Sequence, residues 1–80
     1  MTTLRATPGA WIVVTIPTGT ITATMTIGDS PPQPAFIENI RSRRGVETHA
    51  KRRCPDLRPG RYAVRAVTAD GVTEAQLTVT

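Results

Sequence analysis

The residues that could do chemistry in this chain are few and scattered. There is one cysteine, Cys54, one histidine, His49, and six carboxylates spread singly along 80 residues. A reactive thiol needs a neighbouring base, and the simpler interpretation of Cys54 is a small core residue. One cysteine and one histidine cannot complete a zinc site within the chain. A phosphate loop is absent too, because the residues around Pro17-Thr18-Gly19 lack the required lysine and following helix. We therefore expect no enzyme, no metal, no cofactor and no small-molecule substrate.

The remaining chemistry is electrostatic and lies in residues 41–61, which hold eight of the ten basic residues against two acidic ones. Arginine outnumbers lysine nine to one, and its planar guanidinium pairs with carboxylates and phosphates in a bidentate manner. Its candidate partner-binding residues are Arg41, Arg43, Arg44, Lys51, Arg52, Arg53 and Arg58.

Three interpretations of this basic segment stay open. It could be a solvated edge that discourages pairing between sheets, a docking surface for an acidic protein, or a site for a nucleic-acid backbone. Proteins that read nucleic acid on β-surfaces interleave aromatic and basic residues so that bases can stack. The three aromatic residues, Trp11, Phe36 and Tyr62, are expected in the core. That expectation disfavours nucleic acid, and it leaves Trp11 either as a cap on the open end of the core or as an anchor for a partner.

Alternation of apolar and polar residues predicts the strands that must position these groups. Residues 11–16 are apolar on both faces, and residues 20–27 alternate strictly, with Ile21, Ala23, Met25 and Ile27 expected inside and four threonines outside. The turn at residues 17–19 predicts that the two strands form a hairpin. Residues 28–34 hold three prolines and predict a rigid loop.

Residues 35–54 fit two interpretations. Strands over 36–41 and 46–53 would flank a turn at residues 43–45, whereas a helix would begin near Pro34 and end at Gly45. Asn39, Val46 and Thr48 are indifferent helix formers, which favours the strand pair.

The last third of the chain predicts a second hairpin. Tyr62, Val64 and Ala66 alternate with polar residues, Asp70-Gly71 is a turn pair, and residues 75–79 alternate again. One apolar face on such a hairpin requires a second layer to cover it.

The stretch Leu57-Arg58-Pro59-Gly60-Arg61-Tyr62 resembles the tyrosine corner of immunoglobulin-like sandwiches, particularly those of the fibronectin type III kind. In that family the Tyr ring packs in the core and its hydroxyl bonds upstream backbone, so the resemblance assigns structural roles to Tyr62, Leu57 and, more loosely, Trp11. Small, Thr-, Ala- and Arg-rich domains of this kind also resemble accessory virion proteins of phages that infect high-GC bacteria.

The sequence thus predicts one all-β domain over residues 1–80, a small immunoglobulin-like antiparallel sandwich of six to seven strands, with residues 1–9 as a flexible arm. Its expected function is structural or binding: a phage capsid decoration or head/tail surface protein that docks on an acidic capsid or tail protein in a symmetric assembly. The alternative is a small basic nucleic-acid-binding domain. No membrane partner is expected, and the expected location is the virion or, alternatively, the bacterial cytoplasm.

Overall fold

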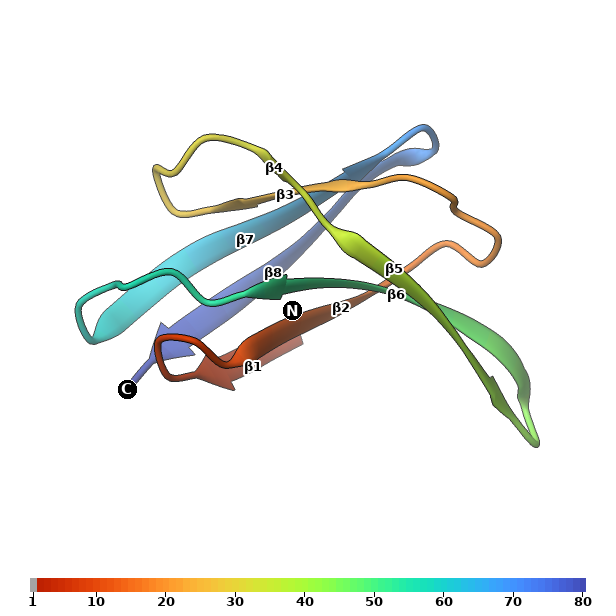
Figure 1. The fold of residues 1–80 in the computed structure, drawn as a ribbon, viewed down its shortest axis with the longest axis horizontal. Helices are drawn as coiled ribbons and strands as arrows, with labels where there is room; N and C mark the ends of the chain where they lie inside the picture. The colour runs from red at the N-terminus through yellow and green to blue at the C-terminus, as the bar shows by residue number, and fades with distance from the viewer. Residues whose placement is uncertain (1) are drawn as a thin grey trace.

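The computed structural model describes residues 2–80 and folds them into two facing β-sheets (Figure 1). The strands are β1 (Thr2–Ala6), β2 (Trp11–Ile16), β3 (Thr24–Ile27), β4 (Gln33–Pro34), β5 (Phe36–Ser42), β6 (Gly45–Arg53), β7 (Gly60–Thr68) and β8 (Gly71–Val79). Among these residues no helix is long and apolar enough to cross a membrane. The predicted all-β sandwich is confirmed, with eight strands in place of six or seven because β1 and the two-residue β4 add to the expected set.

The two sheets are unequal. One has five strands in the order β1-β8-β7-β3-β4, and the other has three in the order β2-β6-β5. All pairings are antiparallel except that of β1 with β8, which is parallel. The chain changes sheet four times, between β1 and β2, β2 and β3, β4 and β5, and β6 and β7, and the passage from β4 to β5 crosses over in Figure 1.

The core lies between the sheets and is built from the apolar positions of the alternating strands. Ile27, Met25 and Leu77 are fully buried, as are Ala66 and Ala50. Burying a side chain of the size of Ile, Met or Leu stabilises a fold by about 1.5–3 kcal/mol, so burial of these residues is a main driving force in a domain this small.

The C-terminal hairpin and the strand pair over residues 35–54 are both confirmed. β7 and β8 pair along their whole length around the turn at Ala69-Asp70, and β5 and β6 pair from Phe36↔Lys51 to Ser42↔Gly45. The helix interpretation of residues 35–54 is therefore wrong. Its β-branched and short polar residues fit a pleated strand that gains hydrogen bonds from a neighbour.

The predicted hairpin of residues 11–16 with 20–27 is wrong. β2 pairs with β6 and β3 pairs with β7, in different sheets, so the segment between them is a crossover. Thr20 turns back on Pro17, whose carbonyl accepts both its N–H and its hydroxyl, and the strand begins only at Thr24. Ile21, expected in the core, lies in this crossover and is 86% exposed.

Residues 2–6 are also not a flexible arm. They form β1, which runs beside β8 from Thr2↔Ala75 to Ala6↔Val79 and covers one edge of the larger sheet. A short strand with a charged residue suits an edge, because both features discourage pairing with another chain.

The tyrosine corner forms as the resemblance implies. The Tyr62 hydroxyl donates to the carbonyl of Arg58 at 2.7 Å, and Leu57 and the Tyr62 ring pack against the core. Gly28 lies under the ring with a φ of +58°, and a Cβ there would lie 3.1 Å from the ring Cδ1 atom. Glycine is thus required at this position both for its backbone conformation and for space.

Candidate binding surface

The basic residues that the sequence indicated as one segment lie on different faces and at different ends of the β5–β6 hairpin. Side chains on β6 alternate between faces, so Lys51 and Arg53 lie on the outer face of the smaller sheet while Arg52 points inward. The arginines at positions 41–44 lie at the other end of the β5–β6 hairpin, about 25 Å away along the strand. The seven candidate residues therefore do not form one surface.

The three cations at the β6 C-terminus are each engaged within the protein. The Lys51 ammonium donates to Glu38 Oε2 at 3.1 Å. Arg52 donates to the carbonyl of Met25 at 3.1 Å and so connects the two sheets. Arg53 donates to the carbonyl of Gly9 at 2.9 Å and stacks on the Trp11 ring at 4.1 Å.

Trp11 and Phe36 were expected in the core, and the structure places both outside it. Trp11 is 39% exposed and Phe36 is 67% exposed on the outer face of the smaller sheet. Their rings meet edge to face with centroids 5.7 Å apart, and Lys51 lies 5.3 Å from the Trp11 centroid. We call Trp11, Phe36, Lys51 and Arg53 the aromatic–cation cluster. Residues 11–16 are apolar on both faces, and that pattern alone does not say which face is covered.

The opposite end of the hairpin projects beyond the rest of its sheet. β2 ends where Ile16 pairs with Thr48, so the pairs Ile40↔Glu47, Arg41↔Val46 and Ser42↔Gly45 have no further strand beside them. We call residues 40–47 the hairpin arm, which extends as the lower right end of Figure 1. Its residues are exposed to solvent because no further strand of the sheet lies beside them among residues 2–80.

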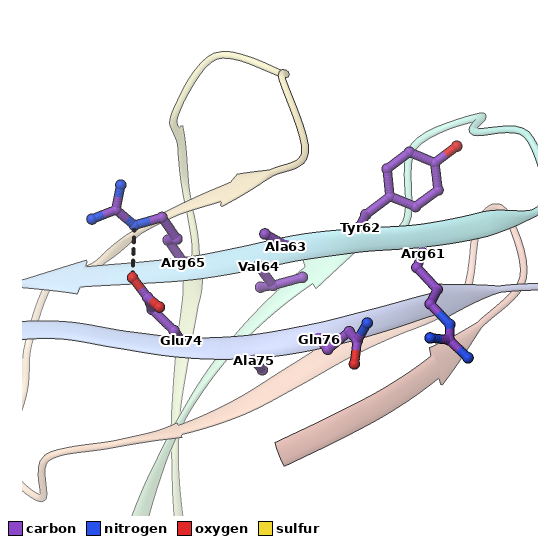
Figure 2. A pocket seen from close by; sticks show the side chains of 8 residues that line it. All are labelled: Arg61, Tyr62, Ala63, Val64, Arg65, Glu74, Ala75 and Gln76. Atoms are coloured by element: carbon purple, nitrogen blue, oxygen red, sulfur yellow. Dashed lines mark ion pairs between the residues drawn. The ribbon is translucent and has the colours of Figure 1, made fainter. Parts of the chain in front are cut away.

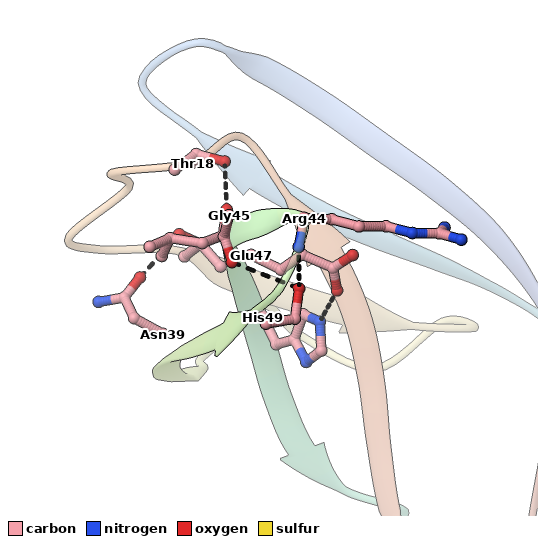
Figure 3. Close-up of polar contacts among 9 residues, drawn as sticks. Thr18, Asn39, Arg44, Gly45, Glu47 and His49 are labelled. Carbon is pink, nitrogen blue, oxygen red and sulfur yellow. Dashed lines mark hydrogen bonds and ion pairs between the residues drawn. The ribbon is translucent and has the colours of Figure 1, made fainter.

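The hairpin arm carries three of the eight basic residues of the segment, within four positions of one another. Arg41, Arg43 and Arg44 are exposed, and within residues 2–80 none of them has a salt bridge. Figure 3 shows the Arg44 side chain extending away from the turn, while the one carboxylate of the arm, Glu47, bonds His49 Nε2 at 3.1 Å. Three guanidiniums with open donors can each take a carboxylate or phosphate.

The root of the hairpin arm is held firmly. The buried Thr48 hydroxyl donates to Asn39 Oδ1 at 2.7 Å and accepts the Gly19 N–H at 3.1 Å. Nearby, Thr18 Oγ1 donates to the carbonyl of Val46 at 3.3 Å (Figure 3). These bonds connect the crossover between the sheets to both strands of the hairpin, so the arm has a fixed direction.

The remaining cations lie elsewhere. Arg58 is exposed at the tyrosine corner, where its backbone carbonyl, rather than its side chain, makes the structural bond. Arg61 and Arg65 flank the exposed Ala63 on the outer face of β7, and Arg65 Nε pairs with Glu74 Oε1 at 3.4 Å (Figure 2). Together with Gln76 they line an open groove of about 510 Å³, which sequence reasoning missed. The one feature of the sequence that indicates this groove is the small residue Ala63, with arginines two positions before and after it on the same face of the strand.

Cys54 and His49 do not form a thiol–base pair. Cys54 is buried, and burial raises the pKa of its thiol, which is the opposite of activation to a thiolate. His49 lies on the outer face with Glu47. Within the part of the chain that the structure describes, no three His, Cys, Asp or Glu side chains gather to hold a metal ion.

No protein-family model and no curated protein matches this chain. Among solved structures, it is similar to SGBP-B of the Bacteroides ovatus mixed-linkage glucan utilization locus, determined in complex with a mixed-linkage heptasaccharide. The two are 25% identical with a TM-score of 0.56, and the match covers 95% of this chain but 21% of the other. The chain thus corresponds to about one fifth of that protein's length, and the likeness concerns a two-sheet β-fold.

Proposed function

We propose that this chain is a non-enzymatic, immunoglobulin-like binding module that docks on an acidic protein surface through its hairpin arm. The observation that carries the proposal is the group of three exposed arginines that have no carboxylate partner in the described part of the chain, on an arm whose root is fixed. The other basic residues of the segment contribute less, because Lys51, Arg52 and Arg53 already bond within the chain, whereas Arg58 and Arg61 lie apart from the arm, at the tyrosine corner and on β7.

Geometry favours an acidic protein over nucleic acid as the partner. A β-surface that binds single strands combines backbone contacts from cations with stacking of bases on aromatic rings. Here Trp11 and Phe36 lie at the end of the sheet opposite Arg43 and Arg44, and Arg53 already covers the Trp11 ring. Stacking and phosphate contact would therefore fall about 20 Å or more apart along the strands.

A virion surface is the setting we propose for this docking, as the resemblance to accessory virion proteins implies. Repeated copies of one acidic shell protein would each receive one arm, as symmetric assemblies require. Flanking genes for capsid and portal proteins would support this setting, and flanking genes for polysaccharide uptake would contradict it.

Immobilised polyglutamate tests the docking chemistry, with a 20-base-pair DNA duplex as the competing anion. Reversing Arg43→Glu and Arg44→Glu together should weaken polyglutamate binding at least about tenfold, because two attractive contacts become repulsive. The matched control reverses Arg5→Glu and Arg58→Glu, which alters net charge equally but leaves the arm intact. Equal losses in both variants would contradict docking through the arm.

Binding to the duplex would support the nucleic-acid alternative. Three phosphate contacts predict a logarithmic salt slope of about −3, and such a slope without polyglutamate binding would replace the proposal.

Carbohydrate binding is the second candidate function, favoured by the structural neighbour that was solved with a heptasaccharide. On this chain the groove at Ala63 is the place for it, since Gln76, Arg61 and the Arg65–Glu74 pair offer planar polar groups around a small floor. Titration with a mixed-linkage glucan heptasaccharide tests this, and Ala63→Trp should fill the groove and abolish any binding there. The arm variant should leave it unchanged.

A further inference from the structure

Strand β5 is an open edge of the smaller sheet. All seven of its residues pair with β6, and its other side has no strand in the part of the chain that the structure describes. A strand in this position presents a row of unpaired N–H and C=O groups to a partner. The length of β5, about 23 Å, is enough for a partner segment of six or seven residues.

The register identifies which backbone groups are free. The turn between Ser42 and Gly45 has two residues, so the closing pair Ser42↔Gly45 exchanges hydrogen bonds, and every second pair along the hairpin does the same. Residues 36, 38, 40 and 42 therefore direct their backbone groups at β6. The N–H and C=O groups of Ile37, Asn39 and Arg41 point away from the sheet.

The edge at β5 lacks the protection that the edge at β4 has. β4 is two residues long, and three prolines at positions 31–34 deny it donors for further pairing. β5 contains no proline, is continuous over seven residues, and is exposed along most of its length. Short length and proline are common ways to block edge pairing, and β5 has neither.

We propose that an extended, acidic segment of a protein partner adds to β5 as a further strand of the smaller sheet. This inference rests on the proposed docking function and supplies its geometry. Backbone hydrogen bonds to residues 37, 39 and 41 hold the segment, and its carboxylates meet Arg41 across the new pair and Arg43 and Arg44 at the turn. A second copy of this chain does not provide that complement, because its β5 carries a single carboxylate, Glu38, which already pairs with Lys51.

The probe is a blocked peptide of seven residues that alternates valine with glutamate or aspartate. A peptide of identical composition with its valines grouped together is the control, since it keeps the charge but loses the pattern of an added strand. We expect the alternating peptide to bind at least about tenfold more tightly than the grouped one. Equal affinities would overturn the added strand and leave electrostatic docking in place.

Asn39→Pro is the variant that tests the edge itself. Proline removes an N–H that points away from β6, so the hairpin should survive while one bond to the peptide is lost and the ring obstructs pairing. Asn39→Ala is its matched control, because both variants lose the bond from Thr48 to the Asn39 side chain. We expect Asn39→Pro to weaken the alternating peptide at least about tenfold relative to Asn39→Ala, with polyglutamate binding alike in both.

Amide hydrogen exchange on the unaltered protein makes the test independent of how the variant folds. With the alternating peptide bound, the amides of Ile37, Asn39 and Arg41 should exchange at least about tenfold more slowly, whereas residues 38 and 40 should change little. Unchanged exchange at these three amides would overturn the inference. If polyglutamate and both peptides fail to bind, both the added strand and the proposed docking function are wrong. If polyglutamate alone binds, only the added strand is wrong.

Discussion

The two ends of the β5–β6 hairpin have similar composition and different surroundings. At one end Arg41, Arg43 and Arg44 have no carboxylate partners among residues 2–80, and at the other Lys51, Arg52 and Arg53 each bond a carboxylate or a backbone carbonyl. The difference comes from what lies beside each end. β2, β3 and the Gly9 loop surround the base of the hairpin, whereas the arm extends beyond β2. A run of basic residues thus keeps its side-chain donors available only where the fold leaves it without neighbours.

The largest expected effect concerns Arg52, whose side chain points inward and bonds the opposite sheet. Arg52→Ala removes a charge-assisted hydrogen bond between the sheets and the packed side-chain stem, and it should lower the free energy of unfolding by about 2 kcal/mol. That is a large part of the stability of an 80-residue domain, which is about 4–12 kcal/mol. Urea denaturation measures it. Arg43→Ala at the arm should change stability by less than about 0.5 kcal/mol, and equal effects would abolish the contrast.

Arg53 should have a smaller effect, with an optical signature. Arg53→Ala removes the cation stacked on Trp11 and the bond to Gly9, and it should cost about 1 kcal/mol because both contacts are exposed. Trp11 is the only tryptophan, so its fluorescence reports the change directly. Arg53→Lys keeps the charge but not the planar stack, and it should recover only part of the loss. An emission spectrum identical to that of the unaltered protein would indicate that the stack does not persist in solution.

Most of the strands and the tyrosine corner could be predicted because their causes are local. Alternation over residues 62–66 and 75–79 fixes a face whichever strand lies alongside, and the Tyr62 hydroxyl bonds a carbonyl four residues upstream. Even the inward position of Arg52 follows from counting parity along β6.

Pairing partners and exposure could not be predicted, because they depend on segments distant in sequence. The apolar strand at residues 11–16 fits beside β3 or beside β6 equally well, and the turn at residues 17–19 serves a hairpin or a crossover. For the same reason the exposure of Trp11 and Phe36 could not be predicted, since they lie on a face that no second layer covers in the described residues. The free charge of the arm became visible only once the register showed where β2 ends.

Arg58, at the tyrosine corner, belongs to neither end of the hairpin and extends the comparison between bonded and unbonded arginines. Arg58 contributes its carbonyl to the Tyr62 bond, so Arg58→Ala should leave stability nearly unchanged, whereas Tyr62→Phe should cost about 1 kcal/mol. Thermal unfolding of both variants in parallel measures the difference. If Arg58→Ala were the more damaging change, its side chain would have to bond the fold, and it would join the engaged group with Lys51.

The smallest expected effect concerns the Lys51–Glu38 pair, which forms a contact but should contribute little to stability. Lys51 pairs with Glu38 at 3.1 Å, yet the two side chains are 24% and 48% exposed, so water competes for both. A double-mutant cycle with Lys51→Met and Glu38→Gln should therefore give a coupling of only about 0.2–1 kcal/mol, which declines in molar salt. The matched cycle pairs Arg65→Met with Glu74→Gln, whose 3.4 Å contact is more exposed and should couple less. A coupling for Lys51 well above 1 kcal/mol would mean that its contact with the Trp11 ring shields the pair from solvent, and the aromatic–cation cluster would then be a stabilising element in its own right.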